Sequence, residues 1–303
     1  EAGRDHPAGH AVIRPLIRSG ALLAAIAIAP LTAHAGESGL CAAPPGGVPI
    51  IAPLEHFAAR IDKGGPLNIV AVGSSSTAGT GASNPGQTYP SQLETDLRQR
   101  FPKLEIHVVN RGKGGEDAPE ELARLAGDVV ALHPDLAIWQ VGTNAVLRRD
   151  DLAADGELMR EGVDLLKRNG IDVVLMDLQY APRVLDRSAF PAMEDLVADT
   201  ADRAHVGLFR RFALMRYWQR SHAPDAPAMV GADGLHMTDA GYECLAVDLA
   251  AALEANWHAE AKLARRAHAA VDSVAGLPAQ RAPGAHGLQS PTDMRRNDAL
   301  PLN

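Results

Sequence analysis

Along this chain, short apolar runs alternate with segments whose apolar residues have helical spacing. Four of them are strong and a fifth is weaker, and they cover residues 67–73, 106–110, 136–142, 171–178 and 205–209. The strong runs are rich in β-branched residues and nearly continuous in apolarity, which is typical of strands buried on both faces. We therefore expect a parallel sheet of about five strands.

The segments between the runs predict helices. One begins at Tyr89-Pro90, since Pro is tolerated in a first helical turn. Asp117, followed three residues later by Glu120, is typical of a capping box at the start of another. Further helical patterns cover residues 152–169 and 192–204, and a last one starts at 238–239. Regular alternation of strands and helices predicts helices on both faces of the sheet.

The N-terminal 35 residues have the order of a secretory signal peptide. Arg14 and Arg18 precede an uncharged apolar run over residues 20–32, and Ala33-His34-Ala35 follows as a small-x-small cleavage site. A short buried helix is the alternative, but Pro30 argues against it. The run is also shorter than the ~20 residues that a membrane span requires. We therefore expect a periplasmic or secreted protein without stable membrane insertion.

Composition divides the remaining chain and excludes one class of partner. Residues 36–52 are a Gly/Pro-rich arm, residues 53–257 form the folded domain, and residues 259–303 lack apolar periodicity and are expected to be a disordered tail. The net charge is −8 and aromatic residues make up 4% of the chain, so a nucleic-acid partner is not expected.

Two cysteines, Cys41 and Cys244, lie near the start of the mature chain and in the last predicted helix. In an oxidising compartment they can form a disulfide that ties the arm to the end of the domain. Two unrelated, buried thiols are an equally good interpretation. Neither residue has the neighbours of a catalytic thiol, and two cysteines provide no zinc framework.

Small polar residues gather where the predicted strands end. The first strand leads into residues 73–77 (GSSST), the second into 110–115 (NRGKGG) and the third into 142–144 (GTN). Ligands of open parallel sheets bind outside the carboxyl ends of the strands. If the strands are correct, the three segments therefore meet at one edge of the sheet.

Two of these features can supply acyl-transfer chemistry. A Ser at the end of a buried strand is exposed beside free backbone N–H groups, although the Ser/Thr run can also simply cap a helix. Asp233 and His236, four residues from first to last, can act as the orienting acid and the general base. An ordinary surface pair and a metal site are the alternatives for Asp233 and His236. A phosphate-binding loop fits poorly, since the Lys-Ser/Thr pair of a P-loop is missing.

Together these segments resemble the SGNH/GDSL family of esterases and lipases, over about residues 66–257. Ser75 within residues 73–77 matches the nucleophile block, and Gly115 matches the glycine of the second block. The third block, Gly-x-Asn, corresponds to Gly142 and Asn144, and the fourth, Asp-x-x-His, to Asp233 and His236.

The resemblance implies a flavodoxin-like three-layer α/β/α sandwich that needs no metal or cofactor. It implies Ser75 as nucleophile, His236 as base and Asp233 as its orienting partner. The oxyanion hole would comprise the backbone N–H groups of Ser75 and Gly115 and the side-chain amide of Asn144. Registering Ser74 or Ser76 as the nucleophile would break the alignment.

Two positions depart from the family pattern. Ser74 stands where an Asp usually precedes the nucleophile, and Ala145 stands where an Asp often follows the Asn. Neither position carries the acyl chemistry directly. Loss of the first carboxylate removes a group that can brace the nucleophile turn, so this turn is expected to be held differently or loosely.

The functional hypothesis is an exported esterase that removes short acyl groups, such as acetyl, from a glycan or small alcohol. The loop over residues 78–91 and the segment 179–191 are candidates to line the site, and Tyr180 and Arg183 can contact a polar substrate or be ordinary solvated residues. An acyltransferase with the same site and a non-catalytic carbohydrate-binding module are the alternative hypotheses. The sequence does not determine the oligomeric state.

Overall fold

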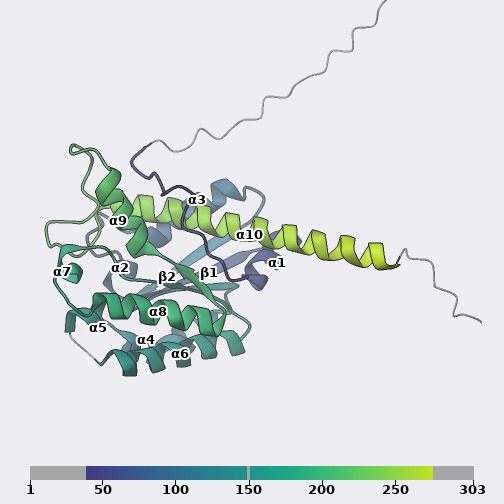
Figure 1. Cartoon of the computed structure of the whole chain (residues 1–303), viewed down its shortest axis with the longest axis horizontal. Helices are drawn as coiled ribbons and strands as arrows, with labels where there is room; N and C mark the ends of the chain where they lie inside the picture. Colours follow the sequence, from purple (N-terminus) through teal and green to yellow (C-terminus); the bar gives the residue numbers. More distant parts are fainter. Residues whose placement is uncertain (1–38, 149–150, 276–303) are drawn as a thin grey trace, which may run out of the picture. The chain divides into compact units, whose positions relative to one another are not determined.

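The computed structural model describes residues 39–148 and 151–275, which are built around a parallel sheet (Figure 1). Its strands are β1 (Leu67–Gly73), β2 (Ile106–Gly112), β3 (Leu136–Gln140), β4 (Asp172–Met176) and β5 (Gly207–Phe209). The spatial order is β2-β1-β3-β4-β5, and each adjacent pair is parallel. This is the flavodoxin-like order, in which the chain reverses direction across the sheet between β1 and β3.

Helices cover both faces of the sheet. One layer contains α1 (Glu55–Lys63), α3 (Tyr89–Arg100) and α10 (Asp239–Ala275), and the other contains α4 (Ala118–Asp128), α6 (Leu152–Arg168) and α8 (Phe190–Ala204). Helix α3 packs against α10, and α6 contacts both α4 and α8. The predicted three-layer α/β/α fold is therefore confirmed. Asp117 also forms the predicted capping box with Glu120 at the start of α4.

Alternation along the strands supplies both layers with apolar side chains. In β1, Ile69 and Ala71 belong to the cluster under α3 and α10, whereas Val70 and Val72 belong to the cluster under α4 and α6. Successive residues of a strand point to opposite faces, so a strand covered on both sides must be apolar at every position. The unbroken apolar runs of the sequence are the direct result.

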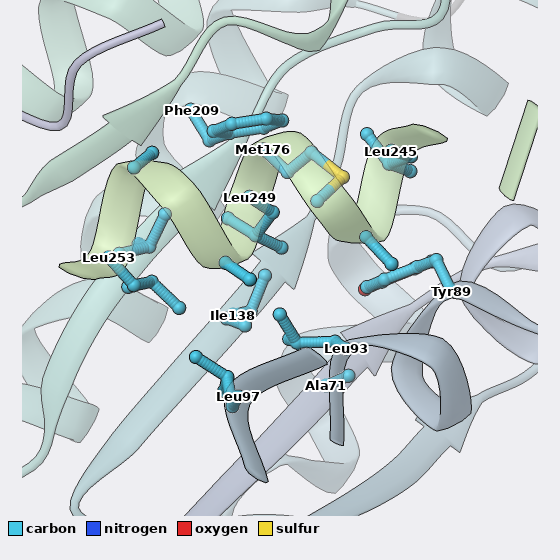
Figure 2. Packing of buried hydrophobic residues seen from close by; sticks show 14 of the residues in the cluster. Ala71, Tyr89, Leu93, Leu97, Ile138, Met176, Phe209, Leu245, Leu249 and Leu253 are labelled. Atoms are coloured by element: carbon cyan, nitrogen blue, oxygen red, sulfur yellow. The ribbon is translucent and has the colours of Figure 1, made fainter. Parts of the chain in front are cut away.

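Figure 2 shows the layer between the sheet and helices α3 and α10. Leu245, Leu249 and Leu253 follow one stripe of α10, spaced four residues apart, and all three are fully buried. Their neighbours in the cluster come from α3 and from four strands, and are Leu93, Leu97, Ala71, Ile138, Met176 and Phe209. Burial of each leucine contributes about 1.5–3 kcal/mol, which holds α10 on the sheet.

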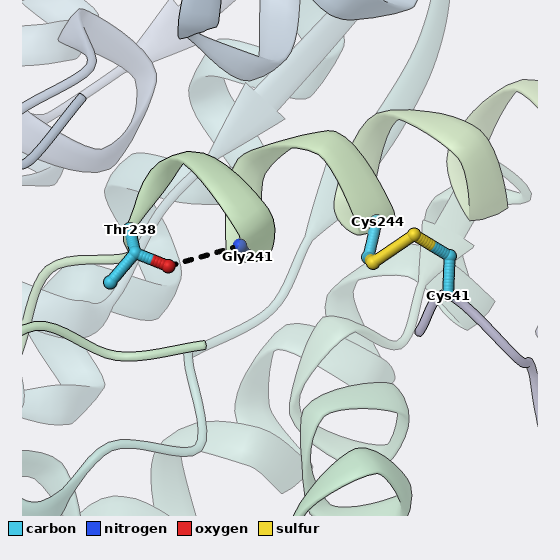
Figure 3. The surroundings of a disulfide bond; sticks show 4 residues. All are labelled: Cys41, Thr238, Gly241 and Cys244. Atoms are coloured by element: carbon cyan, nitrogen blue, oxygen red, sulfur yellow. Dashed lines mark hydrogen bonds between the residues drawn. A yellow bond between two sulfur atoms is a disulfide. The ribbon is translucent and has the colours of Figure 1, made fainter. Parts of the chain in front are cut away.

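The N-terminal arm is attached to α10. Cys41 and Cys244 are joined by a disulfide, the pairing that the sequence left open (Figure 3). Asn256 of α10 adds two hydrogen bonds, because its amide donates to the carbonyl oxygens of Ile50 at 2.8 Å and Ala52 at 2.9 Å. The arm is therefore held against the helix both covalently and by its backbone.

The last helix is longer than the sequence indicated. Helix α10 continues to Ala275, through residues 259–275 that were expected to belong to a disordered tail. The many Ala, Glu, Lys and Arg residues of this segment have high intrinsic helix propensity, which a search for apolar periodicity does not detect. Residues 276–303 and the expected signal peptide, 1–35, lie outside the described residues. Among the helices described, none is long and apolar enough to cross a bilayer.

Candidate active site

The ends of β1, β2 and β3 bring the three polar segments to one edge of the sheet. In the register of the strands, Gly73 is level with Gly112 of β2 on one side and with Gln140 of β3 on the other. The chain leaves each strand through a turn beyond this line. Segments far apart in the sequence therefore lie side by side at the carboxyl edge.

Ser75 is the first residue of the short helix α2 (Ser75–Ala78), which follows β1 directly. Ser76 and Thr77 are buried, whereas Ser75 is half-buried. Asn110 holds the helix from β2, because its amide donates to the Thr77 carbonyl oxygen at 2.8 Å. The first N–H groups of a helix have no partner within it, so the Ser75 hydroxyl lies beside free donors.

His236 and Asp233 lie on the loop before α10 and reach Ser75. The Ser75 Oγ is 2.9 Å from the His236 Nε2, and the His236 Nδ1 is 2.5 Å from the Asp233 Oδ2. The other carboxylate oxygen of Asp233 accepts the backbone N–H groups of Leu235 and His236, each at 3.0 Å. The contacts with Ser75 and Asp233 use both nitrogens of the His236 ring. Among the described residues, no group of three or more His, Cys, Asp or Glu side chains is arranged to hold a metal ion.

The surroundings of Asp233 favour its ionised form. Partial burial opposes ionisation, but the hydrogen bonds from the Leu235 N–H, the His236 ring and the His236 N–H outweigh it, so the pKa of Asp233 is lowered. A carboxylate in this state accepts a hydrogen bond from the N–H at the His236 Nδ1 and keeps the proton on that nitrogen. The His236 Nε2 is then unprotonated and can accept the proton of the Ser75 hydroxyl.

Gly115 lies in the loop after β2, and Asn144 lies in the helix that follows β3. Gly115 adopts a φ of +82°, a conformation that favours glycine, and its neighbour Gly114 would place a Cβ 3.9 Å from that of Ser75. The Asn144 amide donates to the Glu116 carbonyl oxygen at 2.7 Å, which uses one of its two N–H bonds. Arg148, on the same helix α5 (Thr143–Arg148), donates to the Gly115 carbonyl oxygen. Helix α5 therefore holds the loop over 114–116 by two successive carbonyl groups.

The loop over residues 78–91 is bound to the segment that carries His236. A Cβ at Gly81 would lie 2.4 Å from the Met237 carbonyl oxygen, so only glycine permits this approach. The Ser83 N–H donates to Asp239 at 2.8 Å, and the Tyr242 hydroxyl donates to the Thr80 carbonyl oxygen at 2.7 Å. The loop and the histidine are thus positioned together.

Of the residues predicted to contact substrate, Arg183 lies beside the segment that carries Asp233 and His236. Arg183 is exposed, and its backbone N–H donates to the Gly234 carbonyl oxygen at 3.0 Å. The ring of Tyr180 is half-buried and packs edge-on against Phe212, with ring centroids 5.2 Å apart. Arg183 is consequently adjacent to Asp233 and free to reach into solvent, whereas Tyr180 has a packing role as well.

Two buried or nearly buried polar residues were missed by sequence reasoning. Gln140, at the end of β3, accepts hydrogen bonds from Ser74 and Thr77. The guanidinium of Arg124, in α4, donates to the carbonyl oxygens of Gly73 and Arg111, and it also pairs with Glu116. A glutamine inside an apolar strand was the available signal, since buried polar groups need partners. Arg124 gave no such signal, because charged residues are ordinary on a helix.

Comparison with known proteins identifies the family and the fold. The non-GDSL lipase-like family matches residues 40–259, while no curated protein sequence matches the chain. Among solved structures, a two-domain esterase active on acetylated mannans has a TM-score of 0.60 at 19% identity, and the match covers 71% of this chain and 56% of that one. This chain thus spans little more than half of the mannan esterase.

Two further structures match over nearly their whole length. An acetylxylan esterase from Geobacillus stearothermophilus has a TM-score of 0.53 at 23% identity, and the match covers 63% of this chain and 95% of that one. A lipase/acylhydrolase from Enterococcus faecalis has a TM-score of 0.52 at 21% identity, with 61% and 93% covered. At these identities the likeness establishes the shared fold.

Proposed function

The chain belongs to the non-GDSL lipase-like family. We propose that it is a carboxylic ester hydrolase of the SGNH/GDSL type and that it cleaves short acyl esters, acetyl esters of glycans in particular. The observation that carries this proposal is the continuous hydrogen-bonded chain from Asp233 through His236 to Ser75. A nucleophile, its base and the orienting carboxylate are the set that acyl transfer from a serine requires.

In the first half of the reaction, Ser75 becomes acylated. The Ser75 Oγ attacks the ester carbonyl carbon while its proton passes to the His236 Nε2, and Asp233 stabilises the resulting imidazolium. The carbonyl oxygen becomes an oxyanion. It accepts hydrogen bonds from the backbone N–H groups of Ser75 and Gly115 and from the second side-chain N–H of Asn144. The bond to the alcohol oxygen then breaks, and His236 donates its proton to that oxygen as the alcohol leaves.

In the second half, water releases the acid. His236 removes a proton from water as the water oxygen attacks the acyl carbon of the ester formed with Ser75. The same donors hold the second oxyanion. When the bond from the acyl carbon to the Ser75 Oγ breaks, His236 returns the proton to Ser75 and the carboxylic acid leaves. No metal or cofactor takes part in these steps.

The openness of the site supports a bulky alcohol. Gly114 and Gly115 are exposed, and the side chain of Asp233 is 46% exposed, so a large leaving group can remain in solvent. The similar folds of enzymes that act on acetylated mannans and on acetylxylan support a glycan as this alcohol. Arg183, beside Gly234, is proposed to contact its hydroxyl groups, and Tyr180 is proposed to line the same side.

We also propose that the protein is exported. The order of residues 1–35 and the disulfide between Cys41 and Cys244 support a periplasmic or secreted location, since disulfides persist in oxidising compartments. Intact masses before and after thiol alkylation without reductant test the bridge, and two added labels would exclude it. N-terminal sequencing of protein recovered outside the cytoplasm should find a start near residue 36.

The decisive experiment compares wild type with Ser75→Ala on the p-nitrophenyl esters of acetate, butyrate and octanoate. Wild type should prefer acetate, and Ser75→Ala should lose activity and labelling by a fluorophosphonate probe. Ser74→Ala serves as a test of register, because its loss of activity should be smaller than that of Ser75→Ala. Full activity in Ser75→Ala would move the nucleophile to another residue.

Two further assays separate the alternative functions. Release of acetate from acetylated mannan and xylan, with water and then with a soluble polyol in excess, distinguishes hydrolysis from transfer to a second alcohol. A wild type that is inert toward esters and toward the probe, yet binds these glycans, would favour the non-catalytic binding module.

A further inference from the structure

The buried amide of Gln140 faces the nucleophile turn, and we propose that it is a positioning residue that sets the orientation of Ser75. This inference rests on the proposed function, since it assigns a role in the same reaction. Gln140 is the last residue of β3 and is 1% exposed. It touches the residues on either side of Ser75 in the turn and not the nucleophile itself.

Three donors converge on the side-chain oxygen of Gln140. The Ser74 N–H donates to it at 3.2 Å, the Ser74 hydroxyl at 3.1 Å and the Thr77 hydroxyl at 3.3 Å. All three residues are buried, so water cannot replace the contact. One oxygen therefore connects the residue before α2 with the last turn of that helix, and Ser75 lies between the two points.

Ser74 depends on this contact because it does not cap the helix. It occupies the N-cap position of α2, where a Ser hydroxyl ordinarily accepts a backbone N–H of the first turn. Here its side chain makes no capping hydrogen bond and donates to Gln140 instead. The Ser74 hydroxyl therefore holds the turn to β3 and does not cap α2.

The backbone of the turn cannot hold itself. Helix α2 has only four residues, too few for stability without tertiary contacts. Two further contacts hold it: the Asn110 amide donates to the Thr77 carbonyl oxygen from β2, and the Thr77 hydroxyl is hydrogen-bonded to the Tyr89 hydroxyl at 3.3 Å. Gln140 and Asn110 thus hold α2 by hydrogen bonds from the two strands that flank β1. Removal of the Gln140 oxygen leaves the N-terminal end of α2, at Ser74, without its hydrogen bonds to β3.

The test replaces the Gln140 amide and measures the reaction rate per titrated active site. Gln140→Met keeps the length of the side chain but removes the acceptor, and Gln140→Glu keeps an acceptor oxygen. We expect Gln140→Met to lower kcat for p-nitrophenyl acetate and the rate of labelling by the fluorophosphonate by about 100-fold, the cost of a displacement near 1 Å, with KM little changed. Gln140→Glu should recover most of the loss.

The control is Asn256→Leu, which removes another buried amide with two hydrogen bonds, in α10 and remote from Ser75 in the chain. It should lower the melting temperature without changing kcat for each titrated site. If Gln140→Met does not fold, Thr77→Val replaces it, since this isosteric change removes one of the three donors, together with the hydrogen bond to the Tyr89 hydroxyl, and should lower kcat by a smaller factor.

Wild-type kcat and labelling in Gln140→Met, or in Thr77→Val where that variant takes its place, would overturn the positioning role and leave the proposed function intact. Wild type that reacts with neither ester nor probe would instead overturn the proposed function. The positioning role would then fall with it.

Discussion

Replacement of Asp233 by Asn tests whether the carboxylate sets the tautomer of His236. In wild type, one oxygen of Asp233 accepts the ring N–H and the other accepts two backbone N–H groups. An Asn side chain has a single oxygen. It can keep the two backbone contacts, but its NH₂ group then faces the His236 Nδ1 and forces the proton onto Nε2, so the ring cannot accept the proton of Ser75.

The contacts give the size of the effect. The opposite orientation of the amide restores the productive tautomer but turns the NH₂ toward the N–H groups of Leu235 and His236. Leaving two N–H groups without acceptors costs at least about 1 kcal/mol each, and the low end applies because water reaches the exposed residue at position 233. About 2–3 kcal/mol corresponds to a fall in kcat of roughly 30- to 150-fold at neutral pH.

The assay is the steady-state hydrolysis of p-nitrophenyl acetate, normalised to the folded fraction. Asp199→Asn is the matched control, because Asp199 is an exposed residue of α8 whose partner is Arg203 in the same helix. This control should keep the wild-type rate. If Asp233→Asn also kept it, Asp233 would not orient the base.

Further predictions concern stability and the oxyanion. Burial raises the pKa of Glu121 to about 8. The folded chain therefore keeps this carboxyl protonated up to about that pH, whereas the unfolded chain does not. The free energy of unfolding of wild type in urea, measured relative to that of Glu121→Gln, should fall by about 1.4 kcal/mol per pH unit between pH 5 and 8. A constant difference would contradict this. Leu249→Ala should cost about 2–5 kcal/mol in the same assay. Reduction of Cys41–Cys244 should cost about 2–4 kcal/mol, and an unchanged melting temperature would refute it. Asn144→Ala should lower kcat about 100-fold, while an effect confined to KM would argue against an oxyanion role.

The nucleophile turn shows which contacts could not be predicted from the sequence. The substitution at Ser74 was visible in the sequence, and so was the loss of a carboxylate that can brace the turn. What replaces the carboxylate was not visible, because Gln140 lies 66 residues away and meets Ser74 only through the pairing of β1 with β3. The expectation of a differently held turn is confirmed, since Ser74 and Thr77 donate hydrogen bonds to Gln140.

The family and the fold class could be predicted from the sequence because their signals are local. A strand buried on both faces must be apolar throughout, a capping box lies within one helical turn, and motif residues keep their order along the chain. The helix α2 has only four residues, too few to show a period, and it was not predicted; the helix α9 (Arg211–Ser221) was not predicted either.

The tertiary structure decided which distant groups meet. It joined Cys41 to Cys244 across 203 residues and brought Ser75 to His236 across 161. It also assigned Gln140 and Arg124 to the turns of the site. A contact between distant residues leaves no period or spacing in the chain, since its geometry depends on strand order, register and the packing of whole layers. The sequence by itself therefore determined the sheet, its covering helices and the kind of chemistry, and the fold determined how the nucleophile is held.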